Sequence, residues 1–271
     1  MDAEGKVYTF GFNGSGQLGH GNLINLYSPK AIETIKAVDV FPSNGCEHLI
    51  FMNHKQEFCC CGYNNFGQLS KANQESLLSP EYINCIKNAG VSASCSYYHS
   101  IFIVSSEDGP IALSVGRNDS GQLGLGNEIS LYEAKIIKSL YKKKVCTTSC
   151  GLHHSLFLMQ DGTVFSCGFN DNGQLGLKDN KPRYCYSHRN TPTKITDIEL
   201  KFIKGVSCGY YHSMLVTDQG EVYAFGRNDK GQLGLVISLN RKSIQMHCVL
   251  RLNLESFYHM IFKTLSISQS L

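Results

Sequence analysis

The chain contains 271 residues, of which 42% are hydrophobic, with 25 Lys and Arg against 22 Asp and Glu. This composition indicates a folded globular protein and excludes a chain too polar to form a core. Four of the basic residues and a single acidic residue lie in residues 236–271, so residues 1–235 are neutral overall and carry no electrostatic footprint for nucleic acid. No apolar run approaches the length of a membrane span and the first residues lack a secretory pattern, so we expect a cytoplasmic or nuclear protein without a membrane segment.

Five segments along the chain share one pattern, an apolar stretch that ends in Gly and leads into Asn-x-x-Gly-Gln-Leu. They begin at Val7, Phe58, Ala112, Val164 and Val222. Their Gly-Gln pairs are 51 to 58 residues apart, a period typical of tandem structural repeats. With the preceding Asn, the glycine of each pair supplies the backbone conformation that a tight turn requires. We therefore assign a structural turn to each of these glycines: Gly16, Gly67, Gly121, Gly173 and Gly231.

A second motif lies between these turns, in the form Ser-Cys-Gly-x-x-His-Ser or a variant of it. It begins at Ser43, Ser94, Ser149 and Ser207, and its histidines are His48, His99, His154 and His212. An apolar run follows each His, and in three units a pair such as Asp108-Gly109 separates it from a second apolar run. This order predicts a β-hairpin, because Gly accepts the positive φ of a tight hairpin turn. Two further stretches per unit, for example residues 82–86 and 201–206, would complete a four-stranded antiparallel sheet.

The alternation of the two motifs resembles the regulator of chromosome condensation repeat family, and the resemblance covers residues 1–235. It implies a β-propeller, usually of seven blades, that serves as an interaction platform. The namesake of the family is the nucleotide exchange factor of the nuclear GTPase Ran and binds chromatin, and relatives occur in HECT-type ubiquitin ligases and signalling scaffolds. This chain departs from the family pattern at Ser70, where Gly is expected, and it has five Gly-Gln turns instead of seven.

The expected architecture is an all-β propeller of four-stranded antiparallel blades, about four complete blades plus a half blade. Residues 1–235 form the repeat propeller in this interpretation, and residues 236–271, after Leu235, form a divergent tail. The tail sequence FYHMIF at residues 257–262 echoes YYHSIF at residues 97–102. One hypothesis is that residues 258–264 pair with residues 6–10 and close a five-bladed ring, and the alternative is an open arc with an unrelated ending.

The sequence indicates no catalytic or metal site. Three Cys-His pairs four residues apart resemble zinc ligands, but each belongs to a different blade, so we expect them to be dispersed. Ser155 and Ser213 each follow a His, yet adjacent strand residues face opposite sides and no acidic residue recurs with them. We therefore predict a protein that is not an enzyme, has no cofactor, binds no metal and keeps most of its 12 cysteines as reduced, buried thiols.

The best candidate for partner contact is the insertion at residues 178–194, which lies between the fourth and fifth Gly-Gln turns. It combines basic and aromatic side chains, residue types that often anchor interfaces. The predicted partner-binding residues are Lys181, Arg183, Tyr184, Tyr186, His188 and Arg189. The alternative is a solvated connector without a partner.

The leading functional hypothesis is a noncatalytic protein–protein interaction propeller, because each strong motif is explained by blade geometry. A second is guanine nucleotide exchange on a small GTPase, and a third is substrate recognition of the kind found in HECT-type ubiquitin ligases. All three imply a protein partner, which is a small GTPase in the second. The oligomeric state stays open.

Overall fold

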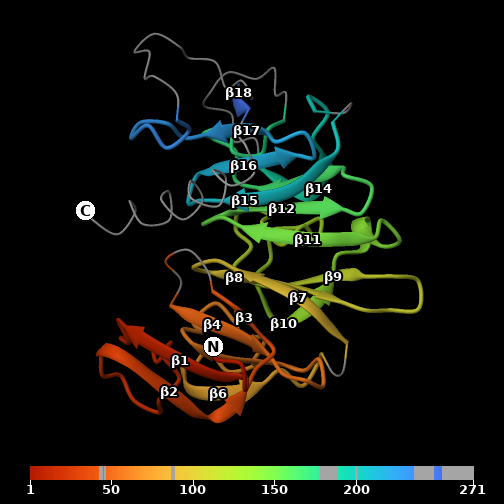
Figure 1. The fold of residues 1–271 in the computed structure, drawn as a ribbon. Helices are drawn as coiled ribbons and strands as arrows, with labels where there is room; N and C mark the ends of the chain where they lie inside the picture. Colours follow the sequence, from red (N-terminus) through yellow and green to blue (C-terminus); the bar gives the residue numbers. More distant parts are fainter. Residues whose placement is uncertain are drawn as a thin grey trace.

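The computed structural model describes residues 1–42, 45, 47–86, 89–177, 188–198 and 201–234, together with the backbone of residues 247–251. These residues form four antiparallel sheets of four strands and one sheet of two strands, which we name blades 1 to 4 and the half blade. The sheets follow one another in chain order, from the half blade at the bottom of the molecule to blade 4 at the top (Figure 1). The predicted all-β propeller of four blades and a half blade is confirmed.

The half blade consists of β1 (Lys6–Gly11) and β2 (Leu26–Lys36). Blade 1 contains β3 (Asp39–Phe41), β4 (His48–Met52), β5 (Phe58–Gly62) and β6 (Leu77–Tyr82). Blade 2 contains β7 (Gly90–Cys95), β8 (His99–Val104), β9 (Ile111–Gly116) and β10 (Leu131–Ile136). Blade 3 contains β11 (Val145–Cys150), β12 (His154–Met159), β13 (Val164–Gly168) and β14 (Arg189–Lys194). Blade 4 contains β15 (Ile203–Cys208), β16 (His212–Thr217), β17 (Glu221–Gly226) and β18 (His247–Arg251).

The second and third strands of each blade form the hairpins that the sequence predicts. In blade 2 the hairpin of β8 and β9 turns at Gly109, with φ of +103°, and in blade 4 that of β16 and β17 turns at Gly220, with φ of +77°. The first strand of blade 4 also lies near the predicted stretch 201–206. The predicted stretch 82–86 is misplaced, because the outer strand β6 ends at Tyr82. Pro80 lies inside β6, and an outer edge tolerates it because no further strand needs its N–H.

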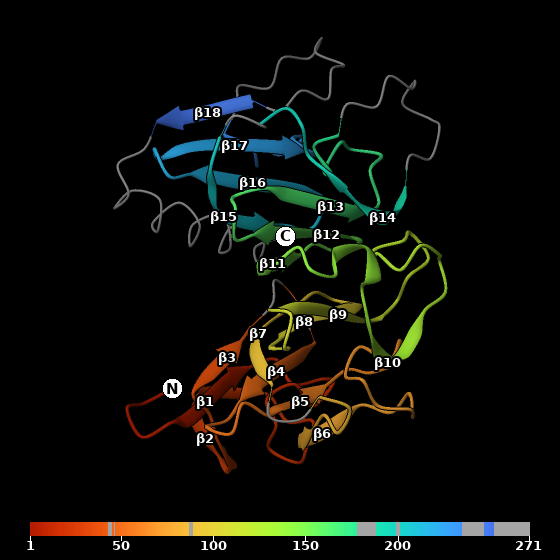
Figure 2. The same ribbon diagram turned by 90° about the vertical axis from the view of Figure 1, so that its right-hand side faces the viewer.

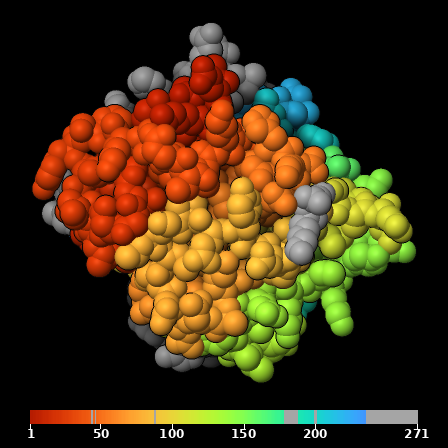
Figure 3. Space-filling view, turned by 90° about the horizontal axis from the view of Figure 1, so that it is seen from below, coloured from red at the N-terminus to blue at the C-terminus, as the bar shows by residue number. Residues whose placement is uncertain are grey.

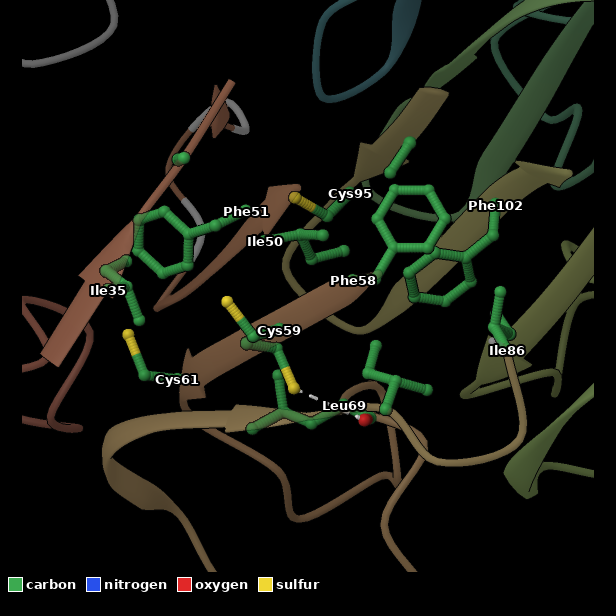
Figure 4. Packing of buried hydrophobic residues seen from close by; sticks show 14 of the residues in the cluster. Ile35, Ile50, Phe51, Phe58, Cys59, Cys61, Leu69, Ile86, Cys95 and Phe102 are labelled. Carbon is green, nitrogen blue, oxygen red and sulfur yellow. Dashed lines mark hydrogen bonds between the residues drawn. The ribbon is translucent and has the colours of Figure 1, made fainter. Parts of the chain in front are cut away.

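Neighbouring blades pack face to face through their inner strands, β4 against β7, β8 against β11, and β12 against β15 (Figure 2). Both faces of an inner strand are therefore covered, which explains why its residues are apolar without alternation. In the core between blades 1 and 2, the ring of the fully buried Phe58 lies 5.1 Å from the Phe102 ring of blade 2 and 6.0 Å from the Phe41 ring (Figure 4).

The cysteine run in β5 belongs to the same core, as Figure 4 shows for Cys59 and Cys61. The Cys60 thiol donates to the carbonyl of Leu69, and the Cys61 thiol donates to the carbonyl of Gln17 in the half blade. Burial raises the pKa of Cys59 to about 12. None of the nine cysteines in the described part of the chain forms a disulfide, and seven of them are buried, in agreement with the prediction that most of the thiols are reduced and buried.

The Asn-x-x-Gly-Gln-Leu turns are held by their own polar side chains. In blade 2, the Asn118 carboxamide accepts from the Leu123 N–H at 2.9 Å, and the Gln122 carboxamide accepts from the Ser120 N–H at 2.9 Å. The same two bonds recur in the other four turns. The motif is therefore a self-contained turn, and its five Gly residues all have φ between +76° and +80°.

These turns also hold adjacent blades together. A Cβ on Gly67 would lie 2.6 Å from the Tyr132 Cα in the outer strand of blade 2, and a Cβ on Gly16 would lie 2.9 Å from the Leu78 Cα in that of blade 1. Figure 3 shows the half blade and blades 1 and 2 as one continuous surface from below. Only Gly both adopts the backbone angle and leaves this space free.

The first and last described strands each pair with a strand of their own sheet. β1 pairs antiparallel with β2, and β18 pairs antiparallel with β17 as the outer strand of blade 4. β18 lies within residues 236–271, the region that the sequence sets apart as a divergent tail. The predicted pairing of residues 258–264 with residues 6–10 lies outside the described residues.

Candidate interaction face

The repeated His and Ser residues form a hydrogen-bonded relay between blades. His99 Nε2 lies 2.8 Å from the Ser155 hydroxyl of the next blade, and that hydroxyl donates to the carbonyl of Gln122 at 2.7 Å. The same pair links His48 to Ser100 and His154 to Ser213. Because each Ser donates to a carbonyl, it accepts from the Nε2–H of the His. Burial lowers the pKa of His48, His99 and His154 to about 3, so they remain neutral.

This relay explains why the Ser-His neighbours in the sequence are not a nucleophilic pair. Ser155 is fully buried, and its proton is committed to a carbonyl. The cysteines of the same motif also bond across blades: Cys150 Sγ donates to the carbonyl of Ser94 at 3.4 Å, and Cys208 Sγ donates to that of Ser149 at 3.3 Å. Among the described residues, no three His, Cys, Asp or Glu side chains gather as a metal site would require.

One end of the propeller carries the side chains that the motifs leave variable. In every blade the His that begins the second strand pairs with the Gly that ends the third, as His99 does with Gly116. The residue before the His and the residue after the Gly therefore emerge side by side, and the Arg117 N–H donates to the Tyr98 carbonyl at 2.9 Å. The same strand geometry repeats in each blade, so these positions share one face of the molecule.

Aromatic rings form a continuous chain of contacts on this face. Tyr98 of blade 2 lies 5.0 Å from Phe66 of blade 1 and 5.6 Å from the imidazole of His153 in blade 3. His153 in turn lies 6.4 Å from Tyr211 of blade 4. We call this surface the aromatic face and define it by Tyr63, Phe66, Tyr97, Tyr98, Arg117, His153, Phe169, His188, Tyr210, Tyr211 and Arg227. Nearly all of these side chains are half-buried, so each presents a partly exposed edge or face.

Two arginines lie on the rings and are neutralised within their own turns. The Arg117 guanidinium lies 5.0 Å from the Tyr98 ring centre and donates to Asp119, while that of Arg227 lies 5.7 Å from the Tyr211 ring and donates to Asp229. The side-chain bond from Arg227 holds the pKa of Asp229 below its usual range. Such stacked, paired guanidinium groups are rigid, which lowers the entropy cost of contact with a partner.

Near the centre of the aromatic face, three sheets converge on Glu47. Its Oε1 accepts from the Tyr97 hydroxyl of blade 2 at 2.6 Å, and its Oε2 accepts from the Ser15 hydroxyl of the half blade at 2.5 Å. The bond to Glu47 is the main reason that the pKa of Tyr97 is raised. Tyr210 of blade 4 lies against Gly45, two residues before Glu47, because a Cβ on Gly45 would lie 3.0 Å from the Tyr210 Cζ. We call Glu47, Tyr97 and Tyr210 the central mouth.

Two of the predicted partner-binding residues of the insertion, His188 and Arg189, lie in the described structure. His188 lies 5.0 Å from the Phe169 ring, and Arg189 begins β14. The other predicted contact residues, Lys181, Arg183, Tyr184 and Tyr186, lie outside the described residues. The sequence-based prediction missed the blade positions themselves, although Tyr98, His153 and Tyr211 occupy one repeat position, directly before the His. The recurrence of Tyr or His directly before the motif His, in three repeats, was the sequence signal that could have identified these positions.

In the part of the chain that the structure describes, no helix has the length and apolar character needed to cross a membrane.

Comparisons with known proteins place this fold among propellers of one family. A family model described as Regulator of chromosome condensation (RCC1) repeat matches residues 4–44, 112–158, 161–216 and 219–247, and a second RCC1 repeat model matches residues 145–174 and 203–232. The chain is 28% identical to the human E3 ubiquitin-protein ligase HERC2 over 245 residues, and 27% identical to the ultraviolet-B receptor UVR8 of Arabidopsis thaliana over 239 residues.

Solved structures share this fold. Yeast RCC1 (Prp20) bound to Kap60 matches with a TM-score of 0.75 at 22% identity, covering 93% of this chain and 58% of that one. Prp20p from Saccharomyces cerevisiae, described with its binding properties to Gsp1p and histones, matches with a TM-score of 0.72 at 23% identity over 90% of this chain and 58% of that one. The alignments cover 89% of this chain but 5% of HERC2, and 88% of it but 52% of UVR8. The repeat matches extend over most of the chain, which therefore belongs to the family of RCC1 repeat proteins.

Proposed function

We propose that this RCC1 repeat propeller is a noncatalytic module that binds a protein partner through the aromatic face. The observation that carries the proposal is the unbroken series of ring contacts from Phe66 through Tyr98 and His153 to Tyr211, which spans four blades. Tyr and Arg are the side chains that most often dominate binding energy at interfaces. Here they stand on loops that a rigid set of sheets holds in place, as binding residues often do.

Contacts within the face support binding rather than catalysis. The relay serines are buried with their protons committed to carbonyls, and the two arginines of the face are already paired with Asp119 and Asp229. These groups thus have structural partners, whereas the aromatic edges beside them are partly exposed. A surface of this composition gains affinity by burying rings and desolvating polar rims.

The test is capture of partner proteins by the full chain and by a Tyr98→Ala, Tyr211→Ala variant. Removal of two anchors is expected to weaken capture by about 30-fold or more, the loss typical of interface hot spots. Tyr27→Ala is the matched control, because Tyr27 lies on the outer strand β2 and its side chain is 96% exposed. Equal capture by the double variant and the control would contradict the assignment of this face.

Two finer functions make different predictions for a captured partner protein. Guanine nucleotide exchange is suggested by the similarity to Prp20p, which is described with its binding to Gsp1p. It predicts that a captured GTPase releases a fluorescent nucleotide faster in the presence of the chain. Substrate recognition of the ligase type is suggested by the similarity to HERC2, and it predicts capture of a protein that is ubiquitinated when the chain is joined to a ligase domain.

A further inference from the structure

We propose that the central mouth binds a Lys or Arg side chain of the protein partner. This inference rests on the proposed function and adds the chemistry of the contact. It begins from the position of Glu47, whose carboxylate is held where the half blade, blade 1 and blade 2 meet.

The Glu47 carboxylate has partners but no counter-ion. It accepts from two hydroxyl groups, those of Ser15 and Tyr97, and in the described part of the chain no Lys, Arg or His lies within ion-pair distance of it. A carboxylate offers about four acceptor positions, so two remain for a further donor. Glu47 is half-buried, and water therefore screens its charge less than it screens that of an exposed side chain.

Two other carboxylates of the face have an Arg partner of their own. Asp119 and Asp229 each follow an Arg by two residues and pair with it. In blade 3 the residue at the Arg position is Phe169, so Asp171 has no such partner and adds a second negative charge to the same face. Over the described face, the four carboxylates of Glu47, Asp119, Asp171 and Asp229 stand against the three cations of Arg117, Arg227 and Lys230, a net charge of −1. This balance favours a cationic side chain over an acidic one.

The rings beside Glu47 suit the same occupant. The Tyr97 ring lies 4.7 Å from the Tyr98 ring, and Tyr98 already holds the Arg117 guanidinium at 5.0 Å on this face. Tyr210 of blade 4 is 39% exposed and lies against Gly45, two residues before Glu47. An ammonium or guanidinium group placed here would donate a charged hydrogen bond to Glu47 and would also be attracted to the ring faces. A metal ion is a poor fit, because one carboxylate and two hydroxyl groups supply too few strong ligands.

The experiment compares two synthetic twelve-residue peptides of Gly and Ser, one with a central Lys and the other with norleucine, which has a similar chain without the charge. Binding to the full-length, isotope-labelled protein is followed by the chemical shifts of the backbone amides of Glu47, Tyr97 and Tyr98. The Lys peptide is expected to bind about tenfold or more tightly than the norleucine peptide, the difference typical of a hydrogen-bonded charge. Indistinguishable titrations with the two peptides would overturn the proposal, and this comparison needs no variant.

The variant Glu47→Gln then assigns the difference. Gln keeps the size of the side chain, and its oxygen can accept from one of the two hydroxyl groups while its NH2 group donates to the oxygen of the other. The melting temperature should therefore change little while the preference for Lys disappears. Glu128→Gln is the control, because Glu128 is exposed on the connection before β10. A Lys preference that survives in Glu47→Gln would refute the central mouth as its source. If Tyr98→Ala, Tyr211→Ala still loses partner capture in that case, the proposed function stands and only the inference about the cation fails.

Discussion

Replacing Ser70 with Gly and Ala134 with Pro, separately and together, tests how successive blades fit together. Ser70 has φ of +55°, which costs an L residue about 1–2 kcal/mol, and its hydroxyl accepts from the Ala134 N–H of blade 2 at 2.9 Å. At the equivalent junction with blade 3, the turn residue is Gly124 and the strand residue is Pro192, which has no N–H. The repeat thus uses two alternative pairs, Ser with Ala and Gly with Pro.

The size of each effect follows from these contacts. Ser70→Gly relieves the backbone but leaves the Ala134 N–H without its partner, at a cost of about 1–3 kcal/mol, so the net loss of stability should be about 1 kcal/mol. Ala134→Pro removes the bond and brings the ring toward the Ser70 side chain, since a Cβ on Gly124 would lie 2.9 Å from the Pro192 Cδ. Overpacking adds about 1–3 kcal/mol, for a total near 3 kcal/mol.

The double variant removes both the unpaired N–H and the clash, so its stability should return to within about 1 kcal/mol of the parent. Urea unfolding of all four proteins, followed by circular dichroism and tyrosine fluorescence, gives the coupling energy, which we expect to be about 3 kcal/mol. Losses that add to within about 0.5 kcal/mol would refute the account of this junction.

Three further predictions concern the turns, the relay and the insertion. Gly121→Val should lower the melting temperature more than Gly231→Val. Both glycines have a similar positive φ, but a Cβ would meet Asn190 only at Gly121. Equal shifts of the melting temperature would contradict this reasoning. The three relay histidines have pKa values of about 3 in the folded protein and stay neutral there, whereas in the unfolded chain they bind protons below about pH 6.5. The stability should therefore be full above about pH 6.5 and fall by about 1 kcal/mol per pH unit for each His as the pH falls toward about 3. A urea midpoint unchanged between pH 7 and pH 5 would argue against this. Replacing Arg183, Tyr184 and Arg189 together with Ala should weaken partner capture at an unchanged melting temperature if the insertion extends the aromatic face, and undiminished capture would make it a connector.

The fold could be predicted because its motifs are held by contacts between residues that are close in the sequence. The contacts between blades could not be predicted from the sequence. The turn of Gly121 could be assigned because its polar partners lie within five residues of it. The bond from His99 to Ser155 joins residues 56 positions apart, and only the stacking of blades shows that a Ser beside one His serves the His of another blade. The outer strand β6 was misplaced for a related reason, since an edge strand has a weaker apolar pattern than an inner one.

The candidate site was predictable only in part. Arg189 and His188 were singled out because they lie in an insertion, and the structure places His188 against Phe169. Tyr98 and Tyr211 were treated as variable positions inside a motif, and their common orientation follows from the pairing of each His with a strand-end Gly. The role of Glu47 could not be predicted, because its partners come from two other sheets.

The His–Ser hydrogen bonds between blades all run in the same direction along the chain. Each His reaches forward to the Ser of the following blade, and that Ser reaches back to the preceding Gly-Gln turn, so every blade in the series is fastened to its immediate neighbours. A load that pulls neighbouring blades apart should then detach them one at a time, in separate force steps, because each His–Ser bond joins one pair of neighbouring blades.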